Sequence, residues 1–152
     1  MRITLVTLLC TLGLVASDGA GARAEDKAAV EKELKKFQGT WVFESVEAGG
    51  KEVPAAELKG ITVTFKGDKY TVKKGDEVTE AATQRLDPSK SPKTLDVTVT
   101  EGPNKGAVML GIYEITADTL RVCFDPDGKN RPTQFKSASG SQTLVVHKRV
   151  KK

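Results

Sequence analysis

Residues 61–77 read ITVTFKGDKYTVKKGDE, and this stretch decides the fold class. Its apolar side chains recur at every second position, first over Ile61–Phe65 and again over Tyr70–Val72. A period of two is typical of strands with one buried face, because successive strand side chains point to opposite faces. Gly67-Asp68 and Gly75-Asp76 separate the runs, and these residues tolerate the positive φ of tight hairpins. We therefore expect consecutive strands to pair as antiparallel neighbours.

The same alternation continues on both sides of this stretch. Further strands are expected over Trp41–Phe43, Val78–Leu86, Leu95–Val99, Ala107–Ile115, Leu120–Phe124 and Thr143–Val150. Together these runs predict an all-β protein with about eight strands, the number at which an up-and-down barrel encloses side chains or one small ligand. A β-sandwich is the alternative, but short sequential hairpins favour the barrel because Greek-key folds need a long crossing connection.

One helix is expected before the first strand. Val30, Leu34 and Phe37 recur at the four-and-three spacing that places them on one helix face, so the pattern predicts an amphipathic helix over residues 26–37. Gly39 follows at the position where a glycine commonly ends a helix. The expected order is therefore one N-terminal helix followed by the barrel.

The N-terminus has the pattern of a cleavable export signal. Met1-Arg2 precedes an apolar run over residues 3–15, and Ala22-Arg23-Ala24 provides a small-x-small cleavage site. The run is shorter than the ~20 apolar residues that span a bilayer, so no stable membrane insertion is expected after cleavage. We expect residues 1–24 to be removed, with Ser17-Asp18 as the alternative site, and residues 25–152 to form one exported domain, periplasmic or extracellular.

Charge and cysteine content narrow the function classes. The chain has 24 basic and 20 acidic residues, a formal charge of +4, and loss of Arg2, Arg23 and Asp18 with the signal leaves +3. The lysines are spread among acids without interleaved aromatic residues, which argues against nucleic-acid binding. Cys123 is the only cysteine after the signal, so no intramolecular disulfide is expected.

Catalytic and metal-binding patterns are weak. His147 is the only histidine, so a nucleophilic mechanism would have to pair it with a residue such as Cys123. Cys123 is expected on the strand face opposite Leu120 and Val122, away from the barrel interior. Residues 125–130 contain oxygen ligands but lack the spacing of a calcium loop. We expect no enzyme activity, no catalytic residue, no metal and no cofactor.

A small apolar molecule is the expected ligand, bound in the barrel mouth opposite the Trp41 end. The candidate lining residues alternate along the expected strands and are Phe43, Val63, Phe65, Tyr70, Val97, Met109, Tyr113, Val122 and Phe124. The alternative is that these side chains fill the barrel themselves, leaving a structural or protein-interaction module of the cell envelope.

The strand over Ala107–Ile115 supports that alternative. It is apolar on both faces, with Met109 and Tyr113 on one and Leu110 and Ile112 on the other. A strand that is apolar on both sides needs a cover on each. We expect the helix to supply part of this cover, on the outer wall or across the barrel end, and a second copy or a protein partner to supply the rest.

Several segments resemble a known family. They are Phe37-Gln38-Gly39-Thr40-Trp41, Leu58-Lys59-Gly60, Phe65-Lys66-Gly67-Asp68, residues 86–93, Glu101-Gly102-Pro103, residues 111–114, Leu120 to Phe124, Arg131-Pro132-Thr133 and Phe135. With these segments the chain resembles a lipocalin-like paralogous domain family of planctomycete bacteria, whose function is undetermined. The resemblance implies a lipocalin-like barrel and no particular chemistry.

The resemblance also extends, more distantly, to lipocalins. Gly39-Thr40-Trp41 is similar to their Gly-x-Trp motif, and a basic residue late in their last strand covers the tryptophan. This implies that Lys148 or Arg149 lies over Trp41. We expect Arg149 within about 6 Å of the ring, because a planar guanidinium stacks on an aromatic face. Strand parity favours Lys148 instead if Leu144 and Val146 point inward.

Overall fold

The computed structural model describes residues 19–137 and 140–151. Within them the chain forms two helices and nine strands. In chain order these are α1 (Gly19–Phe37), β1 (Gly39–Ala48), β2 (Lys51–Glu52), α2 (Ala55–Leu58), β3 (Ile61–Lys66), β4 (Lys69–Lys74), β5 (Glu77–Asp87), β6 (Lys93–Glu101), β7 (Val108–Ile115), β8 (Thr119–Asp125) and β9 (Thr143–Arg149).

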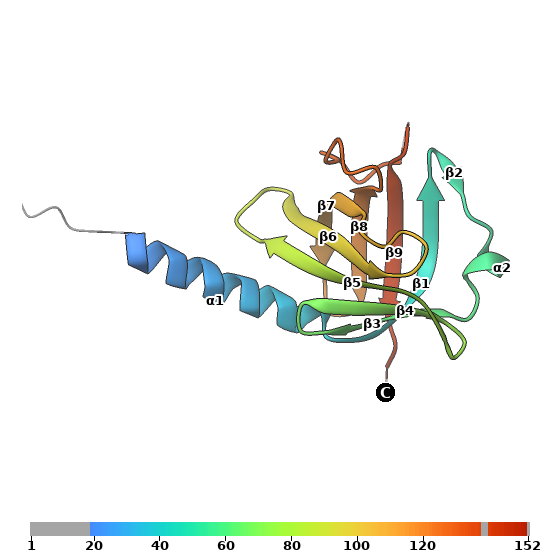
Figure 1. Cartoon of the computed structure of the whole chain (residues 1–152), viewed down its shortest axis with the longest axis horizontal. Helices are drawn as coiled ribbons and strands as arrows, with labels where there is room; N and C mark the ends of the chain where they lie inside the picture. Colours follow the sequence, from blue (N-terminus) through green and yellow to red (C-terminus); the bar gives the residue numbers. More distant parts are fainter. Residues whose placement is uncertain (1–18, 138–139, 152) are drawn as a thin grey trace, which may run out of the picture.

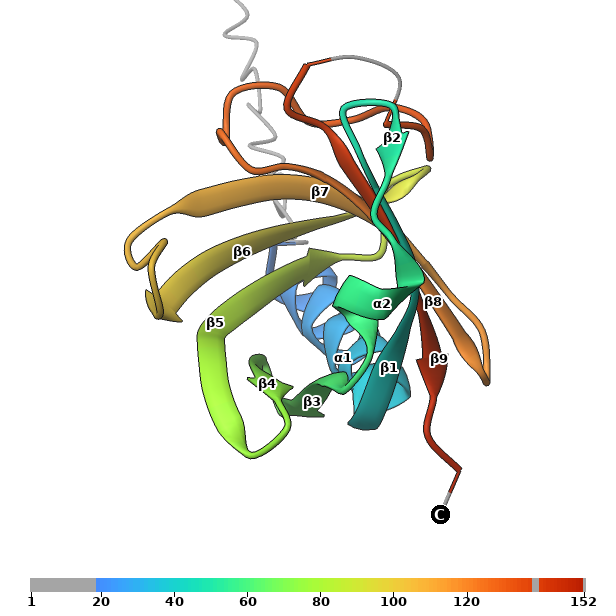
Figure 2. The ribbon, with the colours of Figure 1, turned by 90° about the vertical axis from the view of Figure 1, so that its right-hand side faces the viewer.

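Eight of the strands close into an antiparallel barrel (Figure 1). The sheet order is β1-β3-β4-β5-β6-β7-β8-β9, and β1 pairs with β9 to complete the ring. The two-residue β2 pairs with the C-terminal end of β1. Figure 2 shows these strands surrounding the interior, with α1 beyond one end of the barrel. The predicted eight-stranded up-and-down barrel is confirmed, and the sandwich is not formed.

The tight turns have the backbone that the sequence requires. Gly67 between β3 and β4 has φ +64°, and Gly75 between β4 and β5 has φ +63°. A side chain with a Cβ adopts this left-handed region at a cost, so glycine permits a short connection there. The pairing of each strand with its successor follows from these short turns.

Helix α1 is longer than predicted. It begins at Gly19 rather than Asp26 and ends at Phe37, as expected. Residues 1–18 of the predicted export signal lie outside the described residues. The amide of Gln38 donates to the Leu34 carbonyl over 2.7 Å and satisfies one of the last helical acceptors. The first turns of α1 extend away from the barrel (Figure 1).

The last turns of α1 close one barrel end. The buried Phe37 ring packs edge-on against Phe65 and Tyr113, with centroids 5.3 and 5.2 Å apart. Glu33 is also buried; it accepts a hydrogen bond from the Tyr113 hydroxyl over 3.2 Å and pairs with Lys93 and Lys36. Burial acts to raise the pKa of Glu33, but the two lysines outweigh it and the pKa is lowered.

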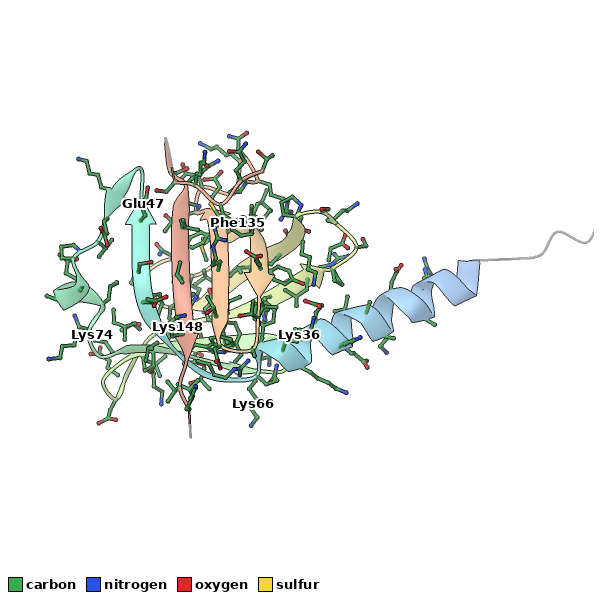
Figure 3. All side chains as sticks on the ribbon, turned by 180° about the vertical axis from the view of Figure 1, so that it is seen from behind. Lys36, Glu47, Lys66, Lys74, Phe135 and Lys148 are labelled. Carbon is green, nitrogen blue, oxygen red and sulfur yellow. The ribbon has the colours of Figure 1, made fainter. Side chains whose placement is uncertain are left out.

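The outer face of β7 and β8 is covered by the chain itself. Ile112 and Cys123 point away from the interior and are 1% and 0% exposed. The connection between β8 and β9 lies over them: the Cys123 thiol donates to the Lys136 carbonyl, and Arg121 stacks 4.7 Å from the Phe135 ring centroid (Figure 3). The chain itself therefore supplies part of the cover that the apolar outer face of β7 requires.

Asp125 holds the start of this connection. Its carboxylate accepts hydrogen bonds from the Ser141 hydroxyl and from the backbone N–H groups of Asp127, Lys129 and Asn130. These donors, the Ser141 hydroxyl foremost, lower the pKa of Asp125 to about 2. Residues 125–130 therefore form a turn in which the Asp125 carboxylate binds the backbone N–H groups that follow it.

Candidate functional site

The barrel encloses a cavity of about 570 Å³. Its walls are the inward-facing residues of β1 and β3–β9, set by the alternation that the sequence predicted. Eight of the nine predicted lining residues are on the wall. They are Phe43, Val63, Phe65, Tyr70, Val97, Met109, Val122 and Phe124.

Tyr113 is the exception, and its prediction as a lining residue is corrected. It points inward as expected, but the Phe37 ring packs on it and its hydroxyl donates to Glu33, so it lies beneath the cavity floor. The sequence placed Tyr113 on the correct face. It could not show that α1 caps this end of the barrel, because that contact joins residues far apart in the chain.

The cavity opens at the end away from Trp41 and α1. The residues that border it there are Lys74 at the end of β4, Pro103 and Asn104 in the β6–β7 turn, and Pro126 just after β8. Phe37 forms part of its floor. The opening therefore lies at the end that the sequence analysis expected.

Aromatic rings form two sides of the cavity. Phe65 and Tyr70 lie 5.6 Å apart between centroids, and Phe43 meets the His147 ring edge-on at 4.6 Å. The Tyr70 hydroxyl donates to Glu80 over 3.1 Å, and burial together with this carboxylate raises the pKa of Tyr70. Tyr70 is therefore neutral at physiological pH and presents an apolar ring to the interior.

Two buried polar residues that sequence reasoning did not place on the wall also line the cavity. Gln84 on β5 and His147 on β9 are 5% and 7% exposed. Burial lowers the pKa of His147 to about 4, although the Leu120 carbonyl acts in the opposite direction. Gln84 could have been predicted on the wall, because it alternates with Ala82 and Leu86, and all three are buried on one face of β5.

The side chains of β9 that point inward are not Leu144 and Val146, the pair that would have favoured Lys148. Val145 and His147 line the cavity, whereas Leu144 and Val146 do not. Leu144 pairs with Cys123 across the β8–β9 ladder, on the outer face. Because the residues from Leu144 to Val146 are all apolar, alternation alone did not show which of them point inward.

This register places Arg149 at the closed end. Its guanidinium carbon lies 4.1 Å from the centroid of the Trp41 ring, within the distance expected from the sequence. Arg149 Nη1 donates to the Gln38 carbonyl and Nη2 donates to the Lys36 carbonyl, each over 2.6 Å. Its Nε donates to the Ala117 carbonyl over 2.7 Å. Gly39, with φ +111°, lies beside the guanidinium.

Lys148 lies on the outer surface of β9 (Figure 3). It is exposed, and its Nζ donates to the Thr119 hydroxyl over 3.0 Å and lies 3.9 Å from Glu44. The alternative assignment of Lys148 to Trp41 is therefore wrong. The indole itself donates to the Phe37 carbonyl over 2.7 Å, so Trp41 and Arg149 together satisfy three carbonyls at the end of α1 and just after it.

The described residues do not assemble the nucleophilic pair that was considered. Cys123 faces outward under Lys136, whereas His147 faces the cavity, so β8 and β9 hold them on opposite sides of the sheet. Burial raises the pKa of the Cys123 thiol, which disfavours the reactive thiolate. Within residues 19–137 and 140–151, no three His, Cys, Asp or Glu side chains are grouped to hold a metal ion.

Comparisons with known proteins returned no protein-family model, no curated protein and no solved structure that matches the chain. None of the described helices is both long and apolar enough to cross a bilayer. The barrel geometry and its cavity are therefore the basis for assigning a function.

Proposed function

We propose that this protein binds one small, largely apolar molecule inside its barrel. The observation that carries the proposal is the cavity of about 570 Å³, which is open at one end and walled mainly by aliphatic and aromatic side chains. This volume falls within the roughly 300–1,000 Å³ typical of small-molecule sites. Barrel residues that filled the interior completely would leave no such space.

The floor supports a binding role as well. Phe37, Trp41 and Arg149 close one end with aromatic packing and hydrogen bonds, so a bound molecule has one route in and out. Apolar surface removed from water contributes about 25 cal/mol per Å², so a ligand enclosed by such walls gains most of its affinity from burial. No charged catalytic group is required for this function.

The resemblance to lipocalin-like domains and an exported location are parts of the same proposal. Gly39-Thr40-Trp41 begins the first barrel strand, and a basic residue of the last strand stacks on the indole. A protein partner is less favoured, because the outer face at Ile112 is already covered by the chain itself. We therefore propose a binding protein rather than an interaction module or an enzyme.

Cavity-filling substitutions test the proposal. Titration with an apolar fluorescent probe should show saturable binding to the wild type, and Val97→Trp and Val122→Trp should each weaken it at least tenfold by occupying the interior. Val42→Trp is the matched control, because Val42 lies on β1 but is 38% exposed on the outside. Equal probe affinity in all four proteins, with unfolding midpoints showing that they are folded, would refute binding inside the barrel.

A further inference from the structure

Two polar atoms on the cavity wall have no hydrogen-bond partner in the described part of the chain. They are Nε2 of Gln84 and Nδ1 of His147. Both residues are more than nine-tenths buried, and both line the cavity. A buried polar group left unpaired loses its hydrogen bonds to water without replacing them, so native proteins keep few such groups without a reason.

The two atoms reach the cavity from opposite walls. In the closed ring, β5 and β9 are separated by three strands in either direction, through β6, β7 and β8 or through β4, β3 and β1. Figure 2 shows them on opposite sides of the barrel. A molecule that occupies the cavity therefore lies between the two strands that carry these residues.

The charges around the cavity indicate what kind of polar group would fit. Glu80 carries the carboxylate on the wall, bonded by the Tyr70 hydroxyl, and Lys74 is exposed at the mouth. Burial holds His147 in its neutral form at physiological pH, with a pKa of about 4. Among the described residues, the buried wall thus has no cation for a carboxylate or phosphate, and an unpaired buried charge costs more than an unmade hydrogen bond.

Resting on the proposed binding function, we propose that the ligand is a neutral, largely apolar molecule that carries a hydroxyl group, held by Gln84 on one wall and His147 on the other. A hydroxyl accepts a hydrogen bond from the Gln84 amide. It can also donate to Nδ1 of His147 or accept from it, so it fits either tautomer of the ring. The remaining wall contacts the apolar body of the ligand.

A matched set of competitors tests this assignment. Displacement of the pre-bound apolar probe is measured with 1-decanol, decyl methyl ether and decanoate, which share one chain and differ in the head group. We expect decanol to bind the wild type about tenfold more tightly than the ether, the ratio that corresponds to about 1.4 kcal/mol for a satisfied buried donor. His147→Phe should reduce the ratio below threefold, because only the hydroxyl can donate to Nδ1, whereas Gln84→Met should weaken the binding of decanol and of the ether alike, because both oxygens accept from the amide.

Each outcome separates this inference from the proposed function. Equal binding of decanol and ether by the wild type, a tenfold ratio that persists in His147→Phe, or an unchanged decanol affinity in Gln84→Met overturns the hydroxyl assignment while leaving apolar binding intact. Tightest binding of decanoate overturns the neutral ligand. If none of the three displaces the probe and the probe itself does not saturate, the proposed function fails.

The unfolding midpoints of the same two variants distinguish a binding role from a structural role. Each substitution replaces an unpaired buried polar side chain with an apolar one of similar size, so the unfolding midpoint should stay the same or rise. A stable variant that binds decanol more weakly supports a binding role. A fall in the midpoint of both variants would assign Gln84 and His147 to the core and overturn the inference.

Discussion

Arg149 shows how one side chain joins three parts of this protein. It stacks on Trp41 at the start of β1, donates to the carbonyls of Lys36 and Gln38 at the end of α1, and bonds Ala117 in the β7–β8 turn. A lysine has one ammonium group and cannot make these planar, divergent contacts together. The guanidinium therefore fixes the helix over the closed end of the barrel.

Replacement of Arg149 should be costly. Arg149→Ala removes the stacking on Trp41 and leaves the carbonyls of Lys36 and Gln38 without their donor, so we expect a loss of about 2–3 kcal/mol in the free energy of unfolding, measured by urea titration. Lys148→Ala and Lys74→Ala are the controls and should change it by less than about 1 kcal/mol, because both side chains are exposed. A loss for Lys148→Ala that equals the loss for Arg149→Ala would contradict this role.

His147 should make stability depend on pH. Its folded pKa of about 4 is below its ordinary value of 6.5, so the unfolded chain binds more protons between these values and stability falls as the pH falls from about 6.5 to about 4. We expect a loss of roughly 2–3 kcal/mol over this window.

His147→Phe is the matched variant, because it removes the titrating group and keeps a ring against Phe43. Its unfolding free energy should change little between pH 6.5 and pH 4, whereas both proteins should lose stability at lower pH as Asp125 is protonated. The Asp125 contribution is present above its ordinary pKa of 3.8 and is lost as the pH falls through about 2. Identical pH profiles for the two proteins would show that His147 is not the group involved.

Helix α1 has two halves with different roles. Residues from Asp26 to Ala29 are exposed, whereas Glu33 and Phe37 are buried against the barrel. The ring of Phe37 covers Tyr113 and Phe65. Lys36, at the C-terminal end of the helix, lies near the barrel (Figure 3). The helix is therefore attached through its last two turns.

Shortening α1 should show this division. A chain that begins at Ala29 should unfold within about 0.5 kcal/mol of the full chain, because exposed residues contribute little. A chain that begins at Gln38 loses the Phe37 ring and the Glu33 contacts, and we expect a loss of about 3 kcal/mol or more and binding of dyes that detect exposed apolar surface. Equal stability of the two shortened chains, measured by urea unfolding, would contradict the proposed cover.

The whole molecule is compatible with removal of the predicted export signal. Arg23 and Ala24 are exposed, so loss of residues 1–24 would remove no described side chain from the core. If the chain is exported, mass spectrometry and N-terminal sequencing of protein recovered outside the cytoplasm should give Glu25 as the first residue. The full-length chain as the only species there would contradict the predicted cleavage.

Much of the barrel could be inferred from local patterns. Alternation assigned the strands, and the glycines after β3 and β4 assigned the turns, because both depend on backbone geometry within a few residues. The lining residues followed from the same alternation in strands with one polar face. Phe43, Val97 and Phe124 were placed correctly in this way.

Other features depend on contacts between distant residues. Both faces of β9 carry apolar side chains over residues 144–146, so alternation did not decide the direction of Leu144, which the pairing of β9 with β8 places on the outer face. His147 lies on the cavity wall because of the register that β9 adopts between β8 and β1, which no local pattern specifies, whereas the parity of Gln84 with Ala82 and Leu86 could be read from β5 alone. The volume of the cavity likewise depends on how side chains from eight strands meet, and packing of that kind is a property of the folded chain alone.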